Sequence, residues 1–220
     1  ALERMAGFYC DLPLGIDETQ LAGNNLGALE KIVYMLASGT GKIRGSKTGG
    51  LQALQTWRTV ILATGEEPIT TETSQTGVST RVLEIYGPPF DDEQSAGLMH
   101  QQSSENCGWA GVEFVKHIVS IGEDEIRQRF SAMLEFVYEK NNGKNGSHAT
   151  GIAAVATADA LIDEWFFGAS QQESTERAMQ MAASIVKENN ENSIRDVNET
   201  AVQYIADWIA SNTRGFTGDG

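Results

Sequence analysis

Several features that mark common protein classes are scarce or missing in this 220-residue chain. It has two cysteines, Cys10 and Cys107, which are too few for a disulfide framework and show no metal-ligand spacing. No apolar run approaches the roughly 18 residues needed to cross a bilayer, and no signal peptide is visible. We therefore expect a reduced, cytoplasmic protein that does not enter a membrane.

Positive charge is also scarce, with 16 Lys and Arg against 30 Asp and Glu, so that the net charge is −14. This balance disfavours non-specific binding of nucleic acid by the whole surface. One segment differs: residues 38–50 contain Lys42, Arg44 and Lys47 and no acidic residue. Its glycines let the backbone approach a ligand closely, and its cations suit a phosphate backbone. We expect this loop to contact DNA; the alternative is a solvated turn.

The most informative stretch is a short apolar run, residues 12–16, that ends in the adjacent carboxylates Asp17 and Glu18. This is the form of a Walker B element, in which the first carboxylate holds a nucleotide-bound Mg²⁺ and the second orients or deprotonates the attacking water. The alternative is a helix N-cap. A phosphate-binding G-x-x-x-x-G-K-[ST] loop is absent from the 220 residues. Because the sequence also starts at Ala1 without Met, we expect a fragment of an ATPase.

Two further residues fit the same kind of site. A second buried strand is predicted over residues 57–64, and its last residue, Thr64, would lie at the same edge of the sheet as Asp17. A polar residue there can hydrogen-bond the γ-phosphate or the lytic water; the alternative is a strand cap. Arg81 opens a third predicted strand, residues 81–86, and an arginine there can act as a finger on a neighbouring subunit's phosphate. The alternative for Arg81 is a salt bridge at the rim.

The order of predicted elements is β-α-β-β followed by helices, which predicts an α/β fold: the distal half of a P-loop NTPase core of the AAA+ or superfamily-3 type, followed by a helical extension. We expect the ATPase core over residues 1–106 and a helical part of that core, or a lid, over 107–140. A linker rich in Asn and Gly is expected over 141–149, and a C-terminal helical subdomain over 150–220.

Three blocks carry a resemblance to a known family: residues 11–18, residues 34–42 and residues 56–66. In this order and spacing they resemble the C-terminal half of a bacterial domain of unknown function, family 927. The resemblance extends over about residues 1–120. It implies a P-loop NTPase of prophages and mobile elements, often fused to primase modules and helicase-like, whose Walker A loop precedes the first residue of this chain.

Within this resemblance, Asp17 and Glu18 correspond to Walker B with Asp17 at the metal, Thr64 to the sensor and Arg81 to the arginine finger. The basic loop resembles the family's Gly-Lys-x-Arg stretch. The implied function is part of an ATP-dependent DNA helicase or translocase. It uses Mg²⁺ and ATP in the full-length protein, binds single-stranded DNA and assembles as a homo-oligomeric ring, whereas the isolated fragment is inactive. The alternative is a non-catalytic DNA- or protein-binding module with a degenerate nucleotide-binding fold.

Overall fold

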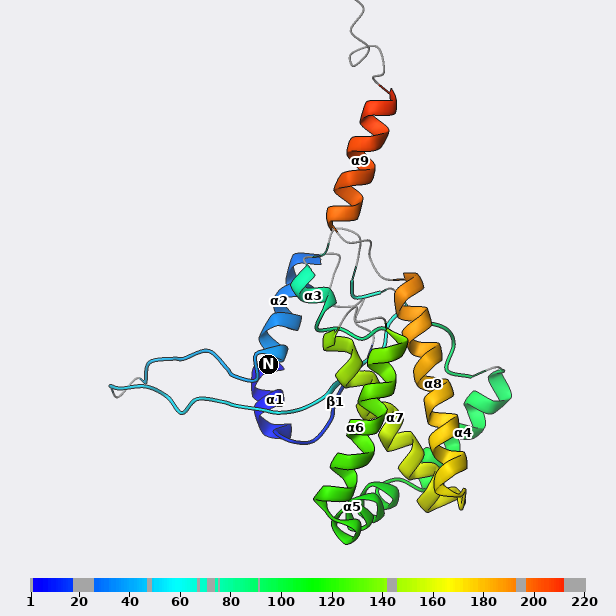
Figure 1. Cartoon of the computed structure of the whole chain (residues 1–220). Helices are drawn as coiled ribbons and strands as arrows, with labels where there is room; N and C mark the ends of the chain where they lie inside the picture. Colours follow the sequence, from blue (N-terminus) through cyan, green and yellow to red (C-terminus); the bar gives the residue numbers. More distant parts are fainter. Residues whose placement is uncertain are drawn as a thin grey trace, which may run out of the picture.

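A computed structural model gives the arrangement of most of the chain (Figure 1). It describes residues 2–17, 26–46, 49–66, 68–70, 74, 76–90, 92–141, 146–192 and 197–211. Along the chain the elements are α1 (Leu2–Tyr9), β1 (Leu14–Ile16), α2 (Leu26–Ala37), β2 (Ile61–Ala63), α3 (Thr76–Ser79), α4 (Glu93–Glu105), α5 (Trp109–Ile121), α6 (Glu123–Lys140), α7 (Gly146–Phe167), α8 (Gln171–Asn192) and α9 (Val197–Ser211).

The N-terminal part, residues 2–64, is built around two short parallel strands. β1 pairs with β2 in the register Leu14↔Ile61, and α2 lies in the connection between the strands. A small core joins the helices to the sheet; it consists of Ala6, Leu14, Leu36 and Trp57, with Ile16, Ile32, Met35 and Ile61 packed against it. The opposite side of the sheet is open, since Leu62 is 61% exposed.

A helical bundle of α6, α7 and α8 holds the larger core. Its buried residues are Met133, Val137, Ala149, Ile152, Ala153, Ala156, Ala160, Ala178, Ala182, Ile185 and Val186. Most of them are alanines, which let neighbouring helices approach closely. α5 packs on this bundle through Phe114 and His117, whose rings lie 5.3 and 5.0 Å from that of Trp165.

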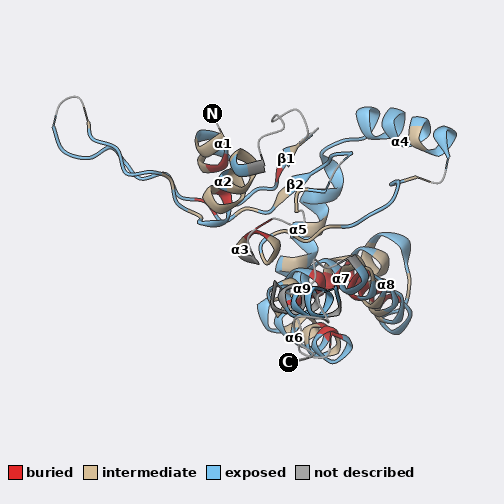
Figure 2. Cartoon of the chain, turned by 90° about the horizontal axis from the view of Figure 1, so that it is seen from above, coloured by how far each residue is buried: buried red, intermediate tan, exposed pale blue. Residues whose placement is uncertain are grey.

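The two parts meet through the chain between α3 and α4. The Nε2 of His148, in the first turn of α7, donates a 2.7 Å hydrogen bond to the backbone oxygen of Ser79. Leu83 packs against the bundle core. Two elements stand away from both parts: α4 lies at the side, and α9 extends beyond the end of α8 (Figures 1 and 2). Figure 2 shows the buried residues concentrated in the bundle and between α1 and α2.

The predicted α/β core of a P-loop NTPase is wrong for this structure. Helices dominate the described residues, and the sheet found in them has two strands. The third predicted strand, residues 81–86, forms no ladder, because its polar groups bond elsewhere. The Glu84 carbonyl accepts from the Asn189 side chain of α8 at 3.3 Å, and the Tyr86 amide donates to Glu188 of α8 at 3.2 Å. This segment therefore lies against the bundle instead of extending the sheet.

The domain boundaries also differ from those the sequence suggests. α7 begins at Gly146, so that the last residues of the expected 141–149 linker are helical, and Ala149 is fully buried. Met133 and Val137 of α6 share one core with α7 and α8, although the sequence places α6 and α7 in separate units. Among the described residues, no helix combines the length and the apolar character needed to cross a membrane.

Candidate functional site

The ends of β1 and β2 bring two of the predicted site residues together. Because the strands are parallel and in register from Leu14↔Ile61 to Ile16↔Ala63, the residues that follow them lie level at one edge. The Thr64 amide donates to the Ile16 carbonyl at 3.0 Å. The Thr64 hydroxyl donates to Oδ1 of Asp17. The position predicted for this pair, at a shared edge of the sheet, is thus the position observed.

The pair presents a carboxylate and a hydroxyl to solvent, since both Asp17 and Thr64 are exposed. Oxygen donors of this kind fit Mg²⁺, which is usually held by one or two carboxylates together with water and substrate phosphates. Among the described residues, no group of three or more His, Cys, Asp or Glu side chains could hold a metal ion. Glu18 lies outside the described residues.

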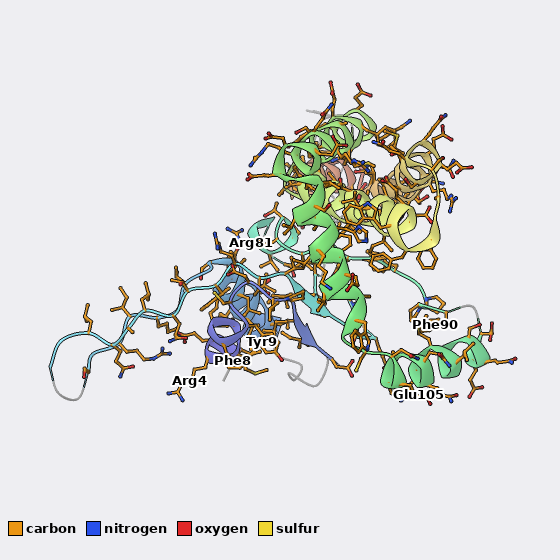
Figure 3. All side chains as sticks on the ribbon, turned by 90° about the horizontal axis from the view of Figure 1, so that it is seen from below. Arg4, Phe8, Tyr9, Arg81, Phe90 and Glu105 are labelled. Atoms are coloured by element: carbon orange, nitrogen blue, oxygen red, sulfur yellow. The ribbon has the colours of Figure 1, made fainter. Side chains whose placement is uncertain are left out.

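Arg81 is not held at a sheet edge, because the strand expected to begin with it does not form. Its guanidinium lies 5.0 Å from the centre of the Tyr34 ring of α2 and donates a hydrogen bond to the Gly77 carbonyl of α3. Figure 3 shows Arg81 on the side of the N-terminal part that faces the bundle, while Phe8 and Tyr9 lie on the other side.

The basic loop belongs to a hairpin arm, described over residues 40–46 and 49–56, that projects from the N-terminal part (Figure 1). Its two sides are joined by the antiparallel bridges Thr40↔Thr56 and Gly45↔Leu51. Between these bridges, the Gln52 amide donates to the Arg44 carbonyl at 2.8 Å. Past the second bridge, Gly49 and Gly50 have positive φ angles of 90° and 82°, which glycine adopts without strain. Lys47 lies outside the described residues.

The base of the arm is closed by Trp57. Its amide donates to the Gly39 carbonyl at 2.9 Å, and its buried indole Nε1 donates to the Leu36 carbonyl at 2.8 Å. The indole thus satisfies one of the carbonyls that the last turn of α2 leaves without a helical partner. Gly39 has φ 68°, and a Cβ there would lie 3.0 Å from the Trp57 carbonyl oxygen. These contacts hold both ends of the arm at one point.

The sequence does not reveal one residue that contacts the arm, Glu3. The arm contains no acidic residue, but Glu3 of α1 lies against it: Oε1 and Oε2 accept from Nη1 and Nη2 of Arg44 at 2.9 and 2.6 Å. Oε1 also accepts from the Lys42 amide at 2.6 Å. The bond from Arg44 is the largest cause that lowers the pKa of Glu3 to about 2, and the Lys42 amide adds to it. Only the structure reveals this pair, because 41 residues separate its members.

The distribution of charge on the arm is therefore uneven. Arg44 is paired with a carboxylate, while Lys42 is exposed and its side chain takes part in no ion pair among the described residues. A phosphate group can approach the Lys42 ammonium directly. A phosphate group that binds Arg44 on the side occupied by Glu3 must displace the Glu3 carboxylate.

Comparison with known proteins identifies one relationship. Residues 1–56 match the model of the family "Domain of unknown function (DUF927)". The matched residues run from α1 through β1 and α2 to Thr56 at the base of the arm. The resemblance to DUF927 is confirmed over these residues, which are fewer than the 1–120 expected. No curated protein and no solved structure matches the chain. DUF927 carries no described activity, so the ATPase and helicase assignments stay predictions.

Proposed function

We propose that this chain is part of an ATP-dependent DNA helicase or translocase, in which it supplies a carboxylate for the nucleotide-bound Mg²⁺ and an arm for single-stranded DNA. The observation that carries the proposal is the hydrogen bond between Thr64 and Asp17 at the ends of two adjacent parallel strands. The connection between these strands contains the arm, so that the expected nucleotide and DNA contacts lie on one continuous segment.

Each site residue has its own proposed role in ATP hydrolysis. Asp17 would hold the Mg²⁺ of a bound nucleotide, and Glu18 would activate the attacking water. The Thr64 hydroxyl donates its single proton to Asp17, so that it can accept a hydrogen bond from the lytic water but must leave Asp17 before it donates to the γ-phosphate. The loop that cradles the phosphates comes from outside this chain, because its sequence has none. In a ring of identical subunits, Arg81 reaches a neighbour's nucleotide only by leaving the Tyr34 ring.

The catalytic half of the proposal is tested on ATP turnover by the full-length gene product. Glu18→Gln keeps the metal ligand and removes the base, so that it should still bind ATP and lose hydrolysis by about 100-fold or more. Asp17→Asn should weaken the Mg²⁺-dependent binding of ATP itself. Glu135→Gln, which removes the same charge from an exposed position on α6, is the matched control. Parental hydrolysis by Glu18→Gln would disprove the assignment and favour a non-catalytic module.

The DNA-binding half is tested with a fluorescent oligothymidylate. Replacing Lys42, Arg44 and Lys47 together by Ala should weaken binding and reduce the dependence of log K on log salt concentration, by about 0.7 for each DNA phosphate that the arm no longer neutralises. The same substitutions should reduce the stimulation of ATP hydrolysis by DNA. If affinity and salt dependence both survive, the arm is a solvated structure and the DNA surface lies elsewhere.

A further inference from the structure

The contact between α1 and the arm has the geometry of a clamp. Glu3 binds the guanidinium of Arg44 with both carboxylate oxygens and the Lys42 amide with one of them. Its side chain is 11% exposed, whereas that of Arg44 is 51% exposed. A Cβ at Gly41 would lie 2.3 Å from Oε1 of Glu3, so that glycine at this position gives the carboxylate room against the arm.

A carboxylate that binds through both oxygens is the same kind of partner for Arg44 as a phosphate group. Guanidinium binds both anions through two parallel N–H donors, and such paired bonds are among the stronger ones in proteins. In this structure the two Arg44 nitrogens that would bind a phosphate in this way already bind Glu3. Because the pair is neutral, Arg44 also contributes little to the positive field around the arm.

We propose that Glu3 is a positioning residue that clamps the arm to α1 and restrains Arg44, so that a DNA phosphate must displace the carboxylate before Arg44 can bind it. This inference rests on the proposed contact between the arm and DNA. It makes DNA affinity depend on a residue outside the arm, and it gives Glu3 an effect opposite to that of the arm's cations. Removal of the Glu3 charge strengthens binding, while removal of a lysine weakens it.

The experiment uses the 220-residue chain and a fluorescein-labelled oligothymidylate of about 20 nucleotides, long enough to cover a single-strand binding site. Anisotropy titrations over a series of salt concentrations compare the wild type with Glu3→Gln, Arg44→Ala and the double variant. Glu3→Gln should bind about threefold tighter or more at low salt, with a salt slope steeper by about 0.7. Arg44→Ala should cost more affinity in the Glu3→Gln background than in the wild type.

Glu135→Gln is the matched control for a general change in charge, since this exposed carboxylate on α6 has no ion pair among the described residues. Hydrogen exchange at the Lys42 amide gives a readout that does not depend on DNA: its protection should fall in Glu3→Ala. Circular dichroism shows whether each variant keeps its helices.

The outcomes separate this inference from the proposed function. If the wild type binds DNA through the arm but Glu3→Gln binds no more tightly than Glu135→Gln, the restraint by Glu3 is wrong and the DNA contact stands. If the effects of Glu3→Gln and Arg44→Ala on the free energy of DNA binding are additive, the restraint by Glu3 is also wrong. If neither the wild type nor Glu3→Gln binds the oligonucleotide at low salt, both this inference and the proposed DNA contact fail.

Discussion

The N-terminal part and the helical bundle are held together in different ways. The core of the N-terminal part has four buried residues, and polar contacts across long stretches of sequence add to it: Glu3 with Arg44, and the Trp57 indole with the Leu36 carbonyl. The bundle has eleven buried residues, most of them alanines on closely packed helices. The first region depends on a few specific bonds and the second on packing.

This contrast coincides with the distribution of candidate functional groups. Asp17, Thr64 and Lys42 lie in the thinly packed region and are exposed to solvent. Segments that bind ligands or move are usually drawn from the less stable parts of a protein. This contrast agrees with the proposed function, in which the N-terminal part carries the chemistry and the bundle is the scaffold. Substitutions in the two regions should affect different measurements.

The largest expected effect is in the bundle. Ile152 is 1% exposed, and Ile152→Ala should lower the free energy of unfolding by about 2–5 kcal/mol, because it removes buried apolar surface and leaves a cavity. Urea unfolding followed by circular dichroism measures this. Val155→Ala on the same helix, where the side chain is 46% exposed, should change the free energy by less than about 0.5 kcal/mol. If residues 2–16 lose hydrogen-exchange protection together with the bundle, the two regions unfold as one unit and the contrast fails.

A smaller effect is expected at the base of the arm. Trp57→Phe keeps an aromatic ring in the core but removes the indole donor, leaving the buried Leu36 carbonyl without this bond. Because the Gly39 amide still donates to this carbonyl at 3.3 Å, we expect a cost of about 0.5–1.5 kcal/mol, seen as faster hydrogen exchange in α2 with unchanged exchange in α7. Trp109→Phe is the control, because that side chain is 77% exposed. If Trp57→Phe and Trp109→Phe show the same hydrogen exchange in α2, packing alone stabilises this region.

The smallest effect concerns pH. The pKa of Glu3 is lowered to about 2 from an ordinary value of 4.5, chiefly by the bond from Arg44. A lowered pKa stabilises the folded state at pH values above the ordinary pKa, so that the stability gained from the ionised Glu3 is complete above about pH 5 and is lost as the pH falls toward 2. Carboxyl-carbon NMR should follow this titration, and Arg44→Ala should move it upward. A wild-type midpoint near 4.5 would show that the clamp does not form in solution.

The sequence predicted local features well and distant contacts poorly. An apolar run followed by Asp17, and a β-branched run followed by Thr64, placed the shared edge of β1 and β2, but β2 covers Ile61–Ala63 instead of 57–64 and is half-buried to exposed rather than buried. The predicted order of elements also placed a helix, α2, between these two strands. These patterns are local, because a strand or an amphipathic helix repeats its signal within a few residues.

The failures arise where distant residues decide the structure. Residues 81–86 alternate like a strand, but Asn189, 105 residues from Glu84, donates to the Glu84 carbonyl. The Asn- and Gly-rich stretch near 141–149 indicated a linker, yet packing of Ala149 in the bundle core extends α7 back to Gly146. Glu3 could not be assigned to the arm, because nothing in the spacing of α1 indicates its partner. In each case a tertiary contact overrides the local pattern.

The pairing of the arm also makes it adjustable in length. Gly45 lies five positions after Thr40, and Thr56 lies five positions after Leu51. Both bridges therefore belong to one unbroken register. Residues can be added or removed in matched pairs beyond Arg44 and Gln52, changing the reach of the arm by about 3.4 Å per pair and leaving the clamp in place. A single deletion on one side would instead turn every side chain beyond it to the opposite face. The length of the arm can therefore change during evolution while the N-terminal part from which the arm projects stays the same.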